Sequence, residues 1–143
     1  MKALRGRCSA IKDIENQVYT PIAQAVRGQF QGAYVTGEYV KTPSKFPHVS
    51  FTESDNYITL SHRDNGSEEK YSTVMYEVNV YSNKTSGKKS ECRAIIALID
   101  QMMYERNFTR IAMTPVPNME DATIYRITAR YRAETDGTNI YRI

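Results

Sequence analysis

Residues 123–133 read TIYRITARYRA, and this sequence sorts its side chains onto two sides of one chain segment. The odd positions are apolar or aromatic, and they are Tyr125, Ile127, Ala129 and Tyr131. The even positions are polar, and they are Arg126, Thr128, Arg130 and Arg132. Successive side chains leave a β-strand on opposite sides, so this alternation predicts a strand with one face in the core and one row of arginines.

The arginine row allows two interpretations. An unpaired buried guanidinium costs more free energy than the burial of one facing apolar side chain returns, so the row must be hydrated or must meet acceptors. In the first interpretation the arginines are solvated. In the second they face a partner, which is either another copy of the chain or a nucleic acid.

A polar turn between two extended runs predicts a long β-hairpin. The runs cover residues 56–62 and 71–82, and the segment between them, RDNGSEEK, contains the turn signal Asn65-Gly66. On the second arm Val74, Tyr76, Val78 and Val80 share one face, whereas Met75, Glu77, Asn79 and Tyr81 share the other. Further strands are expected at 48–53, 108–114 and 139–143, with a short strand or an extended arm within 33–45.

Two amphipathic helices are expected. The first carries an apolar stripe at three- and four-residue steps, formed by Ile11, Ile14, Val18, Ile22 and Val26. Pro21 interrupts that stripe and predicts a kink, or a restart with Thr20 as the N-cap. The second helix runs to about Glu105, with its apolar face formed by Cys92, Ile95, Ile96, Ile99, Met102 and Met103.

The order of these elements predicts an α+β fold, in which a mostly antiparallel mixed sheet is covered on one face by two helices. We expect one domain over residues 1–143, since the length and a hydrophobic content of 41% suit a single core. The Tyr and Ile face of the 123–133 strand is expected to close this core beneath the second helix.

The sequence favours a binding or structural role over catalysis. His48 and His62 have no second metal-type ligand at a standard spacing, and no nucleotide loop or nucleophile motif occurs, so we expect no cofactor and no enzyme activity. The lone Cys8 and Cys92 are expected to be free structural thiols. Without an apolar run of membrane length or an export leader, we expect a cytoplasmic protein with no membrane partner.

The basic residues carry a weak signal about partners. The net charge is +3, which is low for a dedicated DNA-binding protein. Every basic side chain after Lys89, however, is an arginine. Arginine is enriched at interfaces and suits planar contact with carboxylates or phosphates.

Several segments resemble one known family. Residues 45–56 read KFPHVSFTESDN, residues 76–82 read YEVNVYS, a helix rich in alanine and isoleucine follows, and residues 130–133 read RYRA. In these motifs and their layout, residues 11–133 resemble the tail terminator, or tail completion, proteins of long-tailed bacteriophages, which are often called minor capsid proteins.

The resemblance implies a non-enzymatic protein of the virion's head-tail junction. Such a protein forms a ring, typically a hexamer, that caps the tail tube, stops tube polymerisation and joins the tail to the head connector. It would assemble in the host cytoplasm. Its partners would be other copies of itself, the tail-tube protein and the connector, with DNA passing through the lumen. The family fold, a mixed sheet with helices packed against it, agrees with the elements expected above.

A closed ring requires two different complementary patches on each copy. Arg126, Arg130 and Arg132 are candidates for one patch, or for the lining of the lumen. Acidic partners occur at Glu120 and Asp121 and in an assembly loop, where we expect the hairpin to reach a neighbouring subunit or the tail tube. The candidate residues of this loop are Asp64, Asn65, Gly66, Glu68 and Glu69.

Three other functions compete with this expectation. One is a different head-tail joining protein, such as a connector stopper or head completion protein. The second is a nucleic-acid-binding module that uses the arginine row, whose affinity would fall steeply with salt. The third is a small enzyme, which has the least support because no nucleophile and base can be paired.

Overall fold

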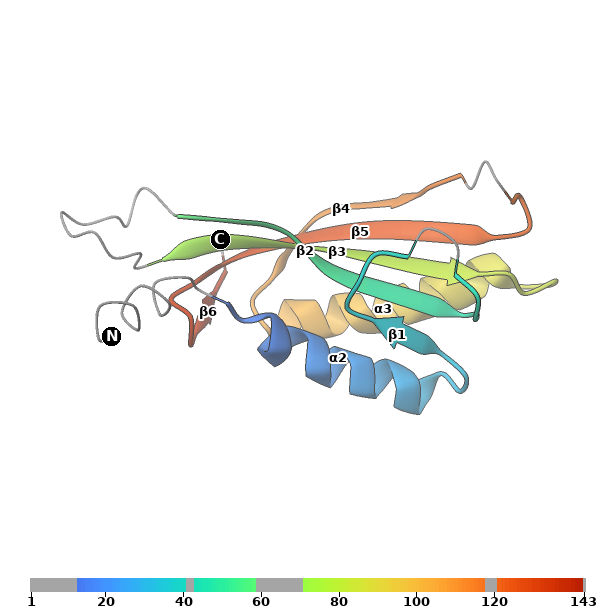
Figure 1. Cartoon of the computed structure of the whole chain (residues 1–143), viewed down its shortest axis with the longest axis horizontal. Coiled ribbons are helices and arrows are strands. Elements are labelled where there is room, and N and C mark those ends of the chain that lie inside the picture. Colours follow the sequence, from blue (N-terminus) through green and yellow to red (C-terminus); the bar gives the residue numbers. More distant parts are fainter. Residues whose placement is uncertain (1–12, 41–42, 59–70, 118–120, 143) are drawn as a thin grey trace, which may run out of the picture.

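The computed structural model describes residues 13–40, 43–58, 71–117 and 121–142. The described residues form two layers, with two helices on one face of a six-stranded sheet (Figure 1). The helices are α2 (Glu15–Gln29) and α3 (Lys88–Glu105). The strands are β1 (Tyr34–Thr36), β2 (His48–Ile58), β3 (Ser72–Ser82), β4 (Thr109–Pro115), β5 (Tyr125–Thr135) and β6 (Ile140–Tyr141).

The sheet is mixed but mostly antiparallel. Its strand order is β1-β2-β3-β5-β4, and β6 pairs with β5 at its C-terminal end. Among the described strand pairs, β1 with β2 alone is parallel. The predicted α+β class, with two helices on one face and a long hairpin formed by β2 and β3, is therefore confirmed.

Strand β5 shows the predicted alternation. Ile127, Ala129, Tyr131 and Ala133 are all at most 4% exposed and belong to the core. The core face lies beneath α3, as expected, because the Tyr131 hydroxyl donates to Asp100 Oδ1 at 3.0 Å.

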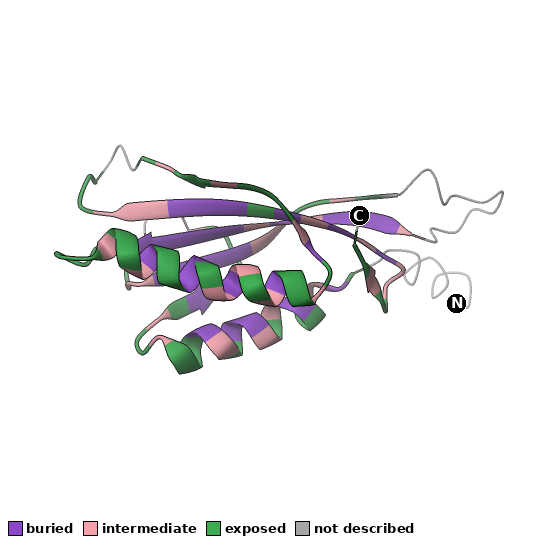
Figure 2. Cartoon of the chain, turned by 180° about the vertical axis from the view of Figure 1, so that it is seen from behind, coloured by how far each residue is buried: buried purple, intermediate pink, exposed green. Residues whose placement is uncertain are grey.

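The two helices bury the faces that the sequence predicts. In α3 the buried side chains are Cys92, Ile95, Ile96, Ile99 and Met103, and Met102 packs against them partly exposed. Figure 2 shows buried and exposed stripes alternating along both helices. In α2 the residues Val18, Ile22, Ala23 and Val26 are buried.

Helix α2 does not restart at Thr20. Pro21 lies inside one continuous helix, so the predicted N-cap at Thr20 is wrong. Pro21 cannot donate a backbone hydrogen bond, but the neighbouring Ile22 is only 1% exposed. Burial of this apolar face offsets the single lost hydrogen bond.

Strand β2 joins two runs that the sequence analysis kept apart. It continues from the predicted strand at 48–53 into the run that begins at Asn56. The register shifts between Glu53 and Asp55, which makes Ser54 the extra residue of a β-bulge. The bulge lets one strand continue although the alternation of its two faces shifts by one residue at Ser54.

Strand β1 resolves the open prediction for residues 33–45. It forms a short strand, in which Tyr34, Val35 and Thr36 pair with His48, Val49 and Ser50. The following segment crosses over the sheet before β2 begins (Figure 1), and the Ser50 hydroxyl donates to the carbonyl of Glu38 in it. This segment covers one end of the sheet face that is turned away from the helices.

Candidate functional site

The candidate site lies on the open face, which we define as the side of the sheet opposite α2 and α3. Strand β3 contributes Glu77, Asn79 and Tyr81 to this face, and β5 contributes Arg126, Thr128, Arg130 and Arg132. These are the second face of the predicted hairpin arm and the even positions of the two-faced strand. The register pairs them directly, so that Glu77 is opposite Arg130, Asn79 is opposite Thr128 and Tyr81 is opposite Arg126.

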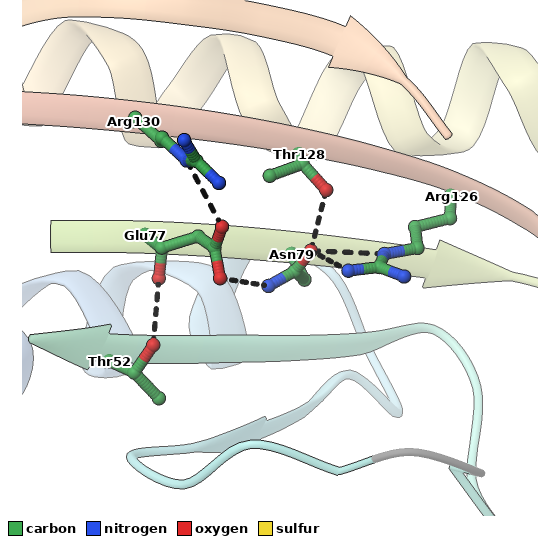
Figure 3. Close-up of polar contacts among 6 residues, drawn as sticks. All are labelled: Thr52, Glu77, Asn79, Arg126, Thr128 and Arg130. Carbon is green, nitrogen blue, oxygen red and sulfur yellow. Dashed lines mark hydrogen bonds and ion pairs between the residues drawn. The ribbon is translucent and has the colours of Figure 1, made fainter. Parts of the chain in front are cut away.

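Asn79 is the centre of a polar network on the open face (Figure 3). Its Oδ1 accepts from Arg126 Nε at 3.0 Å, from Arg126 Nη2 at 2.8 Å and from Thr128 Oγ1 at 2.6 Å. Asn79 is fully buried, and its Nδ2 donates to Glu77 Oε2 at 3.4 Å. The amide therefore fixes the orientation of the Arg126 guanidinium without neutralising its charge.

Glu77 and Arg130 form the adjacent pair of the network. Arg130 Nε lies 3.2 Å from Glu77 Oε1, and the Arg130 side chain is 57% exposed. On the other side, Thr52 Oγ1 of β2 donates to the Glu77 carbonyl. The charge of Arg130 is thus balanced within the chain, in contrast to that of Arg126.

A row of stacked rings leads to Arg126 across four strands. Tyr34, His48, Tyr81 and Arg126 are successive cross-strand neighbours. The rings of Tyr34 and His48 stack with centroids 5.4 Å apart, those of His48 and Tyr81 at 5.7 Å, and the Arg126 guanidinium lies 5.4 Å from the Tyr81 ring. The stack supports the guanidinium from one side through a cation–π contact.

Burial affects the polar atoms of this row. It lowers the pKa of His48 and raises the pKa of Tyr81, so both side chains are neutral at pH 7. His48 Nε2 lies 3.2 Å from Thr36 Oγ1, but the Tyr81 hydroxyl is buried and has no hydrogen-bond partner among the described residues.

A shallow pocket of about 290 Å³ lies in front of the two arginines. Strands β3, β4 and β5 line it with Glu77, Ala112, Thr114, Val116, Arg126, Thr128 and Arg130. Two guanidinium groups face one carboxylate, so the lining carries a net positive charge. The Thr114 hydroxyl and the free edge of a guanidinium are suitable donors to an oxyanion.

The structure brings together two of the three predicted arginines. Arg126 and Arg130 line the pocket, whereas Arg132 does not. Arg132 lies opposite Met75 and Thr109, and its Nε is buried without a hydrogen-bond partner in the part of the chain that the structure describes. The arginine row is therefore neither simply solvated nor uniform.

The predicted assembly loop lies outside the described residues. Asp64, Asn65, Gly66, Glu68 and Glu69 all fall within residues 59–70. Glu120 also lies outside them, whereas the exposed Asp121 accepts from the backbone N–H of Thr123 at 2.9 Å.

The sequence analysis did not identify Asn79, Tyr81, Glu77 or Thr114 as site residues. Their positions in the alternation assign the first three to the second face of the hairpin arm. Nothing in the sequence, however, states that β5 rather than β4 is the neighbour of β3, and the site depends on that pairing.

No candidate metal centre is found among the described residues. Within residues 13–40, 43–58, 71–117 and 121–142, no group of three or more His, Cys, Asp or Glu side chains is placed to hold a metal ion. Cys92 lies on the buried face of α3, where its Sγ donates to the carbonyls of Val80 and Tyr125. Burial, with a smaller contribution from Glu91, raises the pKa of its thiol to about 12.

Comparisons with known proteins leave the family open. No protein-family model matches the sequence, and no curated protein is significantly similar to it. None of the described helices is long and apolar enough to cross a membrane.

Proposed function

We propose that this chain is a tail terminator, or tail completion, protein of a long-tailed bacteriophage. In this role it forms a ring of identical subunits, which we expect to be a hexamer. The ring caps the tail tube, stops its polymerisation and joins it to the head connector at the head-tail junction of the virion. It acts by binding and without enzymatic chemistry.

The observation that carries the proposal is the open face. A sheet face that is polar, held by internal hydrogen bonds and partly accessible is suited to specific association with another protein. The resemblance of residues 45–56 and 76–82 to the tail terminator family supplies the identity of that association. Both segments lie in the hairpin strands β2 and β3, next to this face.

Ring formation also agrees with the distribution of charge. A ring requires two different patches that complement each other. The pocket around Arg126 is positive, and the hairpin sequence 63–70 contains three acidic side chains against two basic ones. Each copy therefore carries both signs of charge on separate segments.

The direct test is assembly of the purified full chain. Light scattering and electron microscopy should reveal closed rings, either alone or after addition of the tail-tube protein. Tail tubes grown in its presence should stop at a defined length and carry a ring at one end. A chain that remains monomeric and leaves tube growth unchanged would contradict the proposal.

A second experiment separates this function from its competitors. A different head-tail joining protein would bind the connector and leave tube growth unaffected. A nucleic-acid-binding module would bind DNA with an affinity that falls steeply as salt is raised. Deletion of residues 64–69 should impair ring formation or tail joining while the monomer stays folded; unaffected assembly would exclude the hairpin as a contact.

A further inference from the structure

We propose that the open-face pocket binds a carboxylate from the acidic hairpin segment, residues 63–70, of a neighbouring copy of this chain. This inference rests on the proposed ring function and assigns its subunit contact. It names Arg126 as the cation that receives the carboxylate and Asn79 as the residue that keeps Arg126 available. Arg130 and Glu77 form the wall of the pocket.

The argument begins with the charge of the pocket. Arg130 is balanced by Glu77, whose carboxylate is 3.2 Å away. Arg126 is bonded to the neutral amide oxygen of Asn79, and the described residues place no carboxylate within ion-pair distance of its guanidinium. The pocket thus retains one uncompensated positive charge, which matches one carboxylate.

The orientation of Arg126 is fixed before any ligand arrives. Its Nε and Nη2 both donate to Asn79, and its guanidinium is supported by the Tyr81 ring. These contacts leave Nη1 available to the pocket, where Thr114 supplies a hydroxyl. A preorganised donor loses little conformational entropy on binding, so this geometry favours association.

The choice of asparagine at position 79 is informative. An aspartate there would have nearly the same shape and would accept the same hydrogen bonds from Arg126 and Thr128. It would also neutralise the guanidinium and remove the attraction for an external carboxylate. Asn79 holds the arginine while preserving its charge.

The hairpin of a second copy is the occupant that the strand geometry favours. Strand β3 begins at Ser72, seven residues before Asn79, which corresponds to about 23 Å along a strand. The strand ends that lead to residues 59–70, Ile58 of β2 and Ser72 of β3, are therefore remote from the pocket. Residues 63–70 contain Asp64, Glu68 and Glu69, which complement the positive pocket of another molecule.

DNA is a weaker match to the pocket than a carboxylate. A DNA backbone presents a regular series of phosphates and is bound by several uncompensated cations. Here one arginine of the row is paired with Glu77, and another, Arg132, lies outside the pocket. A single free guanidinium in a pocket of about 290 Å³ suits a single carboxylate.

The test is a charge exchange in the full chain, with sedimentation equilibrium as the readout. R126E and the double variant E68K/E69K should each weaken self-association by about tenfold or more, and the combined variant should recover most of it. R93E is the matched control, because Arg93 is exposed on α3 on the other side of the sheet and should leave association unchanged. Equal loss in R93E, or no recovery in the combined variant, would overturn the proposal.

N79D tests the role of asparagine while it keeps the acceptor for Arg126 and Thr128; it removes only the donation from Asn79 Nδ2 to Glu77 Oε2 at 3.4 Å. It should fold normally yet weaken association by about three- to tenfold, whereas E77Q should strengthen association because it leaves Arg130 uncompensated. If N79D has the melting temperature of the wild type and also associates as tightly as the wild type, the proposal is contradicted.

The outcomes distinguish this inference from the proposed function. Rings that cap tail tubes but tolerate R126E and N79D would overturn the inference and leave the function intact. Failure of the wild-type chain to form rings or to affect tubes would remove the function and the inference with it. If E68K/E69K altered the melting temperature of the monomer at every concentration, with no change in association, the contact would be intramolecular and the proposal wrong.

Discussion

The two faces of the central sheet are buried in different ways. On the covered face, neighbouring residues such as Val78 and Ala129 are fully buried and pack against the helices. On the open face, Asn79 is equally buried, but hydrogen bonds to Arg126 and Thr128 satisfy it. Burial on one face excludes water from apolar groups, whereas burial on the other keeps a charge in a fixed orientation.

The largest difference between the faces should appear in the reactivity of Cys92. Its thiol lies between α3 and the sheet with a pKa raised to about 12, so it is protonated and shielded at pH 8. A soluble thiol reagent should modify Cys92 at least about a thousandfold more slowly in the native protein than in urea, because reaction requires unfolding. Peptide mapping by mass spectrometry measures this site alone, and rapid native labelling would show that the covered face opens locally.

A cavity on the covered face should cost more stability than one at the exposed edge of the sheet. Ile99→Ala removes part of a fully buried side chain from α3 and should lower the free energy of unfolding by about 3 kcal/mol. Ile111→Ala is the matched control, because Ile111 on β4 is 45% exposed and should cost less than about 1 kcal/mol. Urea denaturation measures the free energy of unfolding of both variants. Equal losses in Ile99→Ala and Ile111→Ala would contradict the distinction between the covered face and the exposed edge.

The open face should respond to the loss of an acceptor more than to the loss of volume. Asn79→Ala leaves Arg126 and Thr128 without their shared oxygen and should cost about 2 kcal/mol. Asn79→Asp retains the acceptor, although it loses the donation from Nδ2 to Glu77, and should therefore cost less than Asn79→Ala. Thermal unfolding of both variants checks this prediction, and similar destabilisation by the two changes would argue against a hydrogen-bonded network.

The smallest effect concerns one hydroxyl on each face. The Tyr81 hydroxyl on the open face is buried without a described partner, so Tyr81→Phe should leave stability unchanged or raise it by up to about 1 kcal/mol. Tyr131→Phe on the covered face loses the bond to Asp100 and should cost about 1 kcal/mol. A rise in melting temperature for Tyr81→Phe and a fall for Tyr131→Phe would sharpen the comparison of the two faces.

Much of the architecture followed from side-chain periodicity. The alternation in 123–133 placed Tyr131 in the core, and the stripe around Ile99 placed α3 over the sheet. Local rules failed at Pro21 and at Ser54, where tertiary packing and a bulge preserved elements that those rules would have divided. Local signals do not include the packing energy that decides such positions.

The site was less accessible to sequence reasoning than the fold. The arginines were visible as candidates, but their internal partners were not, because Glu77 and Asn79 lie about fifty residues earlier in the chain. Which strands become neighbours depends on the topology of the whole sheet. Alternation assigns a residue to a face, but it does not tell which residue stands opposite.

The position of β5 has a consequence for biosynthesis. This strand is made after β3 and β4, yet it occupies the interior of the sheet between them. A nascent chain therefore cannot complete the sheet until about residue 135 has left the ribosome. A chain terminated before β5 would lack both this central strand and Arg126, so it could not enter the proposed ring.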